Sequence, residues 1–316
     1  MRLIHMTDVH FFRPPGLKGL FGKRALGLAN LYVGGRRHYF DAHEVVARAV
    51  ADAQDFAPDA FVMTGDVTAM SSETEFRDAL AAFSPLLDSV PSVVIPGNHD
   101  LYTRGSKKHA RMEKHFGAWM AGGVWDEQRK CWSEGASLRP GESVPWPVRF
   151  RLGQTDFIAT NPCRPVLRSS GLFGPEAIQR ARDLVSESRA AGQQVVFLLH
   201  YPPLDGEGSP YRREGHCLQD VDALLEGFSQ APPHLVLHGH RHEAWRVDFP
   251  VEGEAVPILN CGTTSAISPL PDRTAGYYII ELEDGRLTSV RRRILLEGAE
   301  QFTDHPSRWE ARTAVQ

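Results

Sequence analysis

Short apolar runs, each followed at once by polar residues, recur along the first 243 residues of the chain. Five of these runs predict buried strands, at residues 2–6, 60–64, 91–96, 194–199 and 234–237. Apolar positions with helical spacing predict helices over 42–55 and 73–88, and a third from Pro175 to about Ala191. Because strands that alternate with helices pair in parallel through right-handed crossovers, the pattern indicates an α/β fold.

After residue 243 the pattern changes to short strands in which apolar and polar positions alternate. These strands are predicted at 244–249, 256–260, 276–282 and 286–294, with turns at Gly253 and Asp284–Gly285. They would form an antiparallel edge of the same sheet or a second sheet packed against it. Residues 297–316 are polar and lack periodicity, which predicts a surface tail after one domain of residues 1–296.

The composition is that of a soluble globular protein. Hydrophobic residues make up 42% of the 316 residues and charged residues 23%, which excludes disorder of the whole chain. The net charge of −4 argues against duplex nucleic acid as a partner. No apolar run approaches about 18 residues and no secretory signal precedes the first strand, so we expect a cytoplasmic protein. The four cysteines form no Cys-x-x-Cys pair, which argues against a zinc ribbon or a disulfide framework.

Aspartate, asparagine and histidine residues gather directly after the five predicted strands. They are Asp8, His10, Asp66, Asn98, His99, His200, His240 and His242. Open α/β sheets bind their ligands at the carboxyl ends of strands, so we expect these side chains to converge on one rim. A set of oxygen and imidazole ligands without thiolate suits Mn, Fe or Zn better than calcium. Two such ions about 3.5–4 Å apart, bridged by a carboxylate, serve phosphoester hydrolysis.

The order and spacing of these residues resemble the calcineurin-like metallophosphoesterase superfamily. The similar series is Asp8-x-His10, Gly65-Asp66, Gly97-Asn98-His99-Asp100, His200 and Gly239-His240-x-His242. The resemblance covers residues 8–242, about three-quarters of the chain. It implies an α/β fold in the form of a four-layer αββα sandwich, in which helices flank two mixed β-sheets.

The resemblance also implies a role for each residue of the series. One ion would be held by Asp8, His10 and His242, the second by Asn98, His200 and His240, with Asp66 as the bridge. A hydroxide that bridges the ions would attack phosphorus in line. His99 would protonate or stabilise the leaving oxygen, and Asp100 would orient its ring. The implied cofactors are two divalent or mixed-valence transition-metal ions, Mn²⁺, Fe²⁺/Fe³⁺ or Zn²⁺.

Each motif also has a simpler interpretation. An Asp-x-His pair after a strand is usually a surface turn, and Gly-Asn-His-Asp is a favourable turn sequence because Gly and Asn tolerate positive φ. Among His238, His240 and His242, the residues alone do not decide which two bind a metal, whereas the family pattern selects the last two. His216 lies in a loop rich in glycine and arginine and is a further histidine of interest.

Two insertions are predicted to cap the rim and to select the substrate. Residues 11–40 hold six Lys and Arg residues and no Asp or Glu, with apolar residues at near-helical spacing between the charges. Such a segment is typical of contact with a membrane surface or an anionic substrate, although a helix packed on the body is equally expected. Residues 101–146 form the second insertion. Arg24, Arg104 and Arg164, from these insertions and a neighbouring loop, are predicted to bind substrate.

The pattern leaves several functional classes open. The favoured prediction is a bacterial type of phosphodiesterase that hydrolyses a phosphodiester or pyrophosphate bond in a small phosphoester or nucleotide diphosphate. The basic insertion gives a looser resemblance to the UDP-2,3-diacylglucosamine pyrophosphohydrolases of lipid A synthesis, with an acylated substrate and peripheral contact with the inner membrane. A binding module that kept the fold and lost the chemistry is a third hypothesis, and the intact ligand set argues against it. The oligomeric state is left open.

Overall fold

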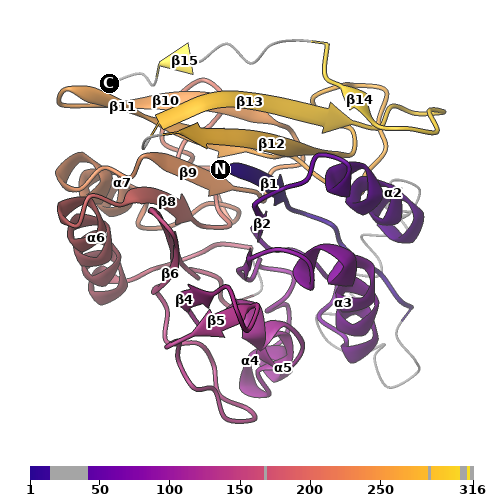
Figure 1. Ribbon diagram of the computed structural model, residues 1–316, viewed down its shortest axis with the longest axis horizontal. Helices are drawn as coiled ribbons and strands as arrows, with labels where there is room; N and C mark the ends of the chain where they lie inside the picture. The colour runs from indigo at the N-terminus through magenta and orange to yellow at the C-terminus, as the bar shows by residue number, and fades with distance from the viewer. Residues whose placement is uncertain (15–41, 167–168, 284–285, 307–311, 314–316) are drawn as a thin grey trace.

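The computed structural model describes residues 1–14, 42–166, 169–283, 286–306 and 312–313 (Figure 1). The predicted substrate residue Arg24 and most of the 11–40 insertion lie outside the described residues. Among the described helices, none has both the length and the apolar composition that a membrane span requires.

Two mixed β-sheets form the centre of the molecule. The strands of the first are β1 (Arg2–Met6), β2 (Ala60–Met63), β3 (Ser92–Val94), β12 (Gly276–Glu283), β13 (Arg286–Ile294) and β14 (Thr303–Asp304). The strands of the second are β4 (Gly123–Asp126), β5 (Cys131–Ser133), β6 (Val148–Leu152), β7 (Thr155–Ala159), β8 (Gln194–Leu198), β9 (Leu235–His238), β10 (Trp245–Val251), β11 (Glu254–Asn260) and β15 (Arg312–Thr313).

The strand order places a run of parallel strands at one edge of the six-stranded sheet and another in the middle of the nine-stranded sheet. The order is β14-β13-β12-β1-β2-β3 in the six-stranded sheet and β15-β10-β11-β9-β8-β7-β6-β4-β5 in the nine-stranded sheet. Strands β1, β2 and β3 are parallel to one another, and so are β7, β8, β9 and β11. The carboxyl ends of β1, β2 and β3 therefore lie at one end of their sheet, as do those of β8 and β9 in the other.

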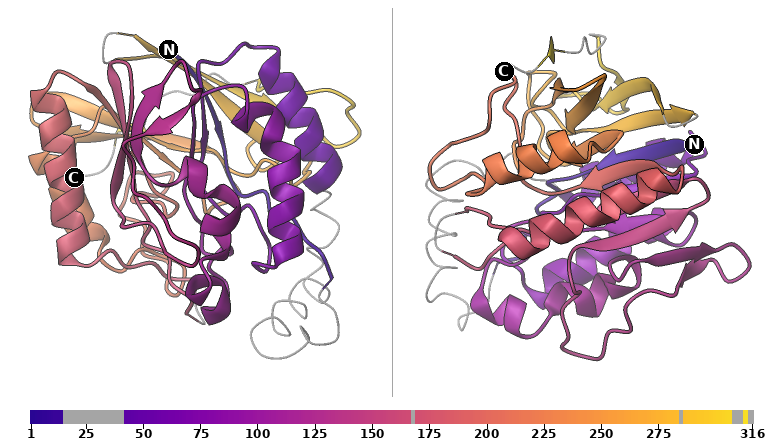
Figure 2. Two further views of the ribbon diagram at one scale, coloured as in Figure 1. Left: turned by 60° about the horizontal axis from the view of Figure 1, so that its bottom comes forward. Right: turned by 90° about the vertical axis from the view of Figure 1, so that its left-hand side faces the viewer.

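Helices cover the outer faces of both sheets. Helices α2 (Ala42–Gln54) and α3 (Glu73–Leu87) lie on one side of the sheets, and α6 (Pro175–Ala190) and α7 (Val221–Gln230) lie on the other (Figure 2). The molecule is thus a four-layer αββα sandwich, as the family resemblance implied. The short helices α4 (Arg104–Lys108), α5 (Arg111–Phe116) and η3 (Gly117–Trp119) follow β3 and lie beside β4 and β5 (Figure 1).

Helix α3 shows how local sequence and packing agree. The Ser72 hydroxyl accepts the N–H of Glu75, and the Glu75 carboxylate accepts the N–H of Ser72, so the chain has a capping box at this helix start. Phe76 and Phe83 of the same helix are buried, and the Phe83 ring stacks on Phe61 of β2 with centroids 5.8 Å apart. Each fully buried phenylalanine contributes about 1.5–3 kcal/mol relative to an exposed one.

The strands after residue 243 divide between the two sheets. The hairpin β10–β11 joins the nine-stranded sheet through β9, and the hairpin β12–β13 joins the six-stranded sheet through β1. The predicted surface tail, residues 297–316, includes two short strands, because β14 pairs with β13 and β15 pairs with β10. Strands of two residues are too short to show an alternating apolar pattern in the sequence.

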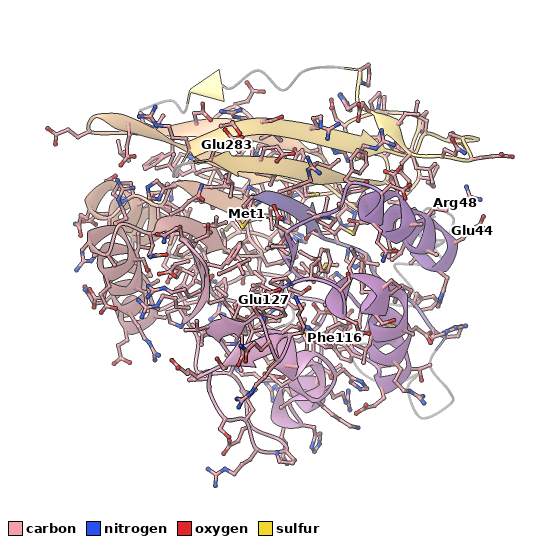
Figure 3. All side chains as sticks on the ribbon, in the orientation of Figure 1. Met1, Glu44, Arg48, Phe116, Glu127 and Glu283 are labelled. Carbon is pink, nitrogen blue, oxygen red and sulfur yellow. The ribbon has the colours of Figure 1, made fainter. Side chains whose placement is uncertain are left out.

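The second predicted insertion, residues 101–146, contributes to the body of the fold as well as to the rim. Strands β4 and β5 extend the nine-stranded sheet beyond β6. The ring centroids of Trp132 in β5 and Phe150 in β6 are 4.9 Å apart. Phe116 at the end of α5 is buried, whereas Glu127 in the turn between β4 and β5 is exposed (Figure 3). Within this segment, α4 follows most directly on the Gly97–Asp100 motif.

Candidate metal centre

Five loops, at the carboxyl ends of β1, β2, β3, β8 and β9, bring the predicted residues together where the two sheets meet. Four non-glycine residues of these loops have positive φ, namely Asp8 (52°), His10 (55°), Asp66 (54°) and His240 (72°). This backbone conformation is unfavourable for residues with a Cβ and concentrates at functional sites. The surrounding structure therefore holds the loops in an arrangement that they would not adopt alone.

Asp8, His10 and His242 form the first cluster. His242 Nε2 lies 3.3 Å from Asp8 Oδ1 and 3.0 Å from His10 Nε2, and His10 Nε2 is 3.7 Å from the same carboxylate oxygen. Asp8 Oδ2 accepts hydrogen bonds from the Thr7 hydroxyl and the His240 N–H, both at 2.8 Å, whereas the buried Oδ1 has no hydrogen-bond partner. One oxygen is held by the protein, and the other is left as a free acceptor beside two imidazoles.

Asn98, His200 and His240 form the second cluster. Asn98 Oδ1 lies 2.8 Å from His240 Nδ1 and 3.2 Å from His200 Nε2. The other nitrogen of each ring faces a backbone carbonyl oxygen. His200 Nδ1 lies 2.8 Å from the carbonyl oxygen of Thr64, and His240 Nε2 lies 2.9 Å from that of His216. Because a carbonyl only accepts, those nitrogens carry the protons. The other nitrogen of each ring, Nε2 of His200 and Nδ1 of His240, therefore faces Asn98, and it offers a lone pair to a metal ion there when the ring is neutral.

The Asp66 carboxylate lies between the two clusters. Its Oδ2 is 3.3 Å from His200 Nε2 and 3.8 Å from His10 Nε2, so one oxygen faces both groups. Its Oδ1 accepts the N–H of His99 at 2.7 Å, which fixes the orientation of the carboxylate. Asp66 groups with His200 and His240, and also with His10 and His99, at distances that could hold a metal ion.

Charge in the site favours cations. Burial acts to raise the pKa of Asp66, but His200 and His99 hold it well below its usual value, so the carboxylate stays ionised. Burial also acts to lower the pKa of His200, and the Asp66 and Asp8 carboxylates outweigh it and raise that pKa to about 9. Burial, followed by the charge of His200, lowers the pKa of His240 to about 3. Ionised carboxylates beside imidazole lone pairs and an orphaned acceptor on Asp8 fit divalent metal ions.

His99 lies beside the clusters and has its own fixed orientation. Its Nδ1 faces the Ala69 carbonyl oxygen at 2.7 Å, and its ring stacks on Tyr102 with centroids 5.5 Å apart. The edge of the ring meets His10 at 4.8 Å between centroids. Burial lowers the pKa of His99 to about 4, although Asp66 acts in the opposite direction. At neutral pH the ring is therefore neutral and carries its proton on Nδ1.

The expectation that Asp100 orients His99 is corrected by these contacts. Asp100 accepts the Gly97 N–H, the Thr68 N–H and the Thr68 hydroxyl, each at 2.9 Å. A carboxylate with these donors joins the loop after β2 to the loop after β3, and the Ala69 carbonyl orients the His99 ring instead. Asp100 is therefore a positioning residue for the two loops.

Two glycines of the motifs are required for close approach. A Cβ at Gly97 would lie 2.7 Å from Asp66 Cγ and nearer still to Oδ1, and a Cβ at Gly239 would overlap Asp8 Oδ2 and the Thr7 side chain. The loops after β3 and β9 therefore pack directly against the carboxylates of Asp66 and Asp8. The structure thus gives a physical reason for glycine in both motifs.

The sequence did not indicate the residues that form hydrogen bonds to the backbone of Asp8 and of the adjacent Thr7. The Thr263 hydroxyl donates to the Asp8 carbonyl oxygen at 2.8 Å. The Thr7 N–H donates to the Thr264 hydroxyl, and the Thr264 N–H donates to the Thr7 carbonyl oxygen. A Thr-Thr-Ser run after a strand is too common to indicate this role. His216 contributes its carbonyl to the site, as the bond to His240 shows.

The remaining predicted residues have different places. His238 is fully buried beneath the clusters, where its ring lies 5.7 Å from that of Trp245, and burial lowers its pKa to about 3. Arg104 is exposed at the start of α4. Arg164 lies in the loop after β7, and its guanidinium donates to Gln219 Oε1 at 2.9 Å. His238 thus belongs to the core, whereas both arginines lie in segments that follow strands at the rim.

Known proteins share this arrangement of elements. A family model described as calcineurin-like phosphoesterase matches residues 1–244. A dimetal phosphatase from Danio rerio has a similar structure, with a TM-score of 0.57 and 12% identity over 96% of this chain and 98% of that protein. A purple acid phosphatase from yellow lupin (Lupinus luteus) seeds has a TM-score of 0.56 and 13% identity over 99% of this chain, which spans 54% of the lupin protein. No curated protein matches the chain in sequence.

At these identities the structural similarities establish the fold, and the family match establishes the relationship. The matched residues include all eight residues of the site and most of the chain. The protein belongs to the calcineurin-like phosphoesterase family and is a metal-dependent phosphoester hydrolase.

Proposed function

We propose that the chain hydrolyses phosphodiester or pyrophosphate bonds with two transition-metal ions bound at the two clusters. The proposed ligands are Asp8, His10 and His242 for one ion, Asn98, His200 and His240 for the other, and Asp66 for both. The observation that carries the proposal is the position of Asp66 Oδ2, which faces both His10 and His200. A carboxylate oxygen shared between two ligand clusters is what a dinuclear phosphoesterase site requires.

Two ions bound there would supply an activated water near neutral pH and positive charge for the phosphoryl oxygens. Ligands of oxygen and imidazole without thiolate favour Mn²⁺, Fe²⁺/Fe³⁺ or Zn²⁺. The chain itself holds the ligand atoms in place: backbone carbonyls fix the rings of His200 and His240, and a backbone N–H fixes Asp66. Preorganised ligands of this kind avoid a reorganisation cost during the reaction.

His99 is proposed to give a proton to the leaving oxygen. Because Nδ1–H is bonded to the Ala69 carbonyl, the transferred proton has to come from Nε2 of the protonated ring. A ring whose pKa is lowered to about 4 releases that proton readily, and the negative charge of a bound phosphoryl group would favour the protonated form. Arg104 and Arg164 are proposed to contact the substrate outside the scissile phosphate.

The test is hydrolysis of bis-p-nitrophenyl phosphate by protein treated with a chelator and then restored with Mn²⁺. We expect about two ions per chain by elemental analysis, and activity that is lost with the ions and returns with them. Asp66→Ala should lose most of its metal content and most of its activity, because the two ions lose the same charged ligand. Glu127→Gln, an exposed carboxylate in the β4–β5 turn, is the matched control and should retain both. Near-normal activity and metal content in Asp66→Ala would refute the proposal.

A further inference from the structure

A buried segment beside the first cluster lies outside the motifs that carry the proposed ligands. It consists of residues 260–265, Asn-Cys-Gly-Thr-Thr-Ser, and begins at the last residue of β11. The family model matches residues 1–244, so the segment lies beyond the matched part of the chain. The polar side chains of Asn260, Thr263, Thr264 and Ser265 are all fully buried. Because buried polar groups are normally hydrogen-bonded, their partners show what the segment holds in place.

The Asn260 side chain holds the backbone on both sides of His242. Its Nδ2 donates to the carbonyl oxygen of Arg241 at 3.1 Å and to that of Glu243 at 2.8 Å. An amide oxygen in the place of this nitrogen would face two acceptors, so the orientation of the amide is fixed. The His242 side chain is 37% exposed, whereas the other two side chains of the first cluster are buried. Asn260 therefore anchors the ligand of this cluster that the core surrounds least.

Two hydroxyl groups of the same segment hold the turn that carries Asp8 and His10. The Thr263 hydroxyl donates to the Asp8 carbonyl oxygen at 2.8 Å, and the Ser265 hydroxyl donates to the Val9 carbonyl oxygen at 2.6 Å. Asp8 and His10 both have positive φ, and residues in this conformation depend on the surrounding structure to hold them. All three ligands of the first cluster are thus attached, through their backbone, to one segment.

The second cluster is held by other parts of the chain. Among the described residues, the side chains of the 260–265 segment form no hydrogen bond with the loops after β3 and β8, which carry Asn98 and His200. The His200 ring is fixed by the Thr64 carbonyl. His240 shares its loop with His242, but its ring is fixed by the His216 carbonyl. The two clusters therefore have separate supports.

We propose that Asn260, Thr263 and Ser265 are positioning residues for the metal ion of the first cluster, and that the ion of the second cluster does not depend on them. The inference rests on the proposed function and assigns the support of one ion to the 260–265 segment. These side chains act through the backbone of the ligands. Groups that orient metal ligands typically change metal affinity by about 10–100-fold when they are removed. Their removal should therefore weaken one ion and leave the other.

The test measures Mn²⁺ binding to the chelator-treated protein by calorimetry and by electron paramagnetic resonance. Thr263→Val keeps the shape of the side chain and removes its donor. We expect one of the two Mn²⁺ affinities to fall about 10–100-fold and the other to stay unchanged, so that at low Mn²⁺ the spectrum is that of a single ion instead of a coupled pair. Thr263→Ser keeps the hydroxyl and should keep both affinities. Thr155→Val, which removes a buried hydroxyl that donates to Gln194 at the amino end of β7, is the matched control and should also keep both.

Two further measurements keep the result decisive. Asn260→Asp removes both donors to the His242 loop and should weaken the same ion as Thr263→Val. In the metal-free protein, Thr263→Val should also accelerate hydrogen exchange of the His10 N–H, which donates to the Asp66 carbonyl at 2.9 Å, by about 5- to 10-fold. The Leu199 N–H, which donates to the Leu237 carbonyl at the end of β8, should exchange at the wild-type rate.

Thr263→Val with two wild-type affinities, or with both affinities lowered equally, would overturn the positioning role. The same holds if Thr263→Ser loses as much as Thr263→Val, because the hydroxyl would then not be the group that matters. A lower melting temperature with unchanged Mn²⁺ binding would mean that the segment only stabilises the fold. Failure of the proposed function has a different signature: the wild-type protein would bind fewer than two ions. Hydrogen exchange needs no metal, and it decides the role of the segment in that case.

Discussion

Replacing Gly97 by alanine should damage the site through Asp66 without changing any proposed ligand. The added Cβ would lie 2.7 Å from Asp66 Cγ, whereas carbon atoms in contact prefer about 3.5–4.0 Å. The carboxylate or the loop therefore has to move by roughly 1 Å. That movement also weakens the 2.7 Å bond from the His99 N–H to Asp66 Oδ1. Gly97 does not have positive φ, so the effect comes from the steric overlap.

The expected size follows from how metal sites respond to such changes. Disturbing the groups that orient metal ligands typically costs about 10–100-fold in metal affinity. A displacement of about 1 Å near the reacting atoms costs about 100-fold in rate. Overpacking should lower the free energy of unfolding by about 1–3 kcal/mol, which leaves the protein folded at 25 °C. Metal affinity is measured by calorimetry, rate with bis-p-nitrophenyl phosphate and folding by circular dichroism.

Gly105→Ala is the matched control for this experiment. It lies in α4, close in sequence, and its added Cβ would come no nearer than 3.8 Å to another atom, the ordinary contact distance. In a helix, this exchange should stabilise the protein slightly. The reasoning would be refuted if Gly97→Ala kept wild-type metal affinity and rate, or if Gly105→Ala lost as much.

Three further predictions concern His99, Asp100 and the protons of the site. His99→Ala should keep both metal ions and lose about 10²–10⁴ in rate, with a smaller loss for nitrophenyl than for alkyl leaving groups; equal losses would show that the ring positions phosphate instead. Asp100→Asn should lower the melting temperature, because the amide nitrogen would face N–H donors of Gly97 or Thr68, at a cost of about 1–3 kcal/mol; an unchanged melting curve would contradict the positioning role. His200 has a pKa of about 9 before metal binds, so binding of the ion at pH 7 should release about one proton from its ring, and metal affinity should fall as the pH falls. Calorimetry in two buffers of different ionisation enthalpy measures this proton release. If no proton is released, the assigned charge state of His200 is wrong.

The sequence predicted strands β1, β2, β3, β8 and β9, helices α2, α3 and α6, and the convergence of eight side chains, because each depends on local patterns. It did not predict β6, β7 or α7. Buried runs such as residues 194–199 give strong strand signals, and Ser72 with Glu75 marks a helix start. The strands β4, β5, β14 and β15 left no comparable signal, since they are short and lie at or next to sheet edges. The division of the last hairpins between the two sheets is decided by packing, which a single sequence pattern does not encode.

The site shows the same division between local and long-range information. The family motifs led to the residues that are proposed as metal ligands. The partner of the His99 ring depends on where the loop with Ala69 passes, and the family resemblance assigned that role to Asp100. The carbonyl of His216 that holds His240 comes from a loop 24 residues earlier. Every residue carries a backbone carbonyl group, so no sequence motif could have indicated which carbonyls hold the histidine rings.

The central claim is that two metal ions share Asp66, and anomalous diffraction from crystals of the Mn²⁺-loaded protein tests it most directly. We predict two anomalous peaks about 3.5–4 Å apart, both within coordination distance of Asp66 Oδ2. One peak should be bound by Asp8, His10 and His242, and the other by Asn98, His200 and His240. A single peak, or two peaks of which only one contacts Asp66, would contradict the account.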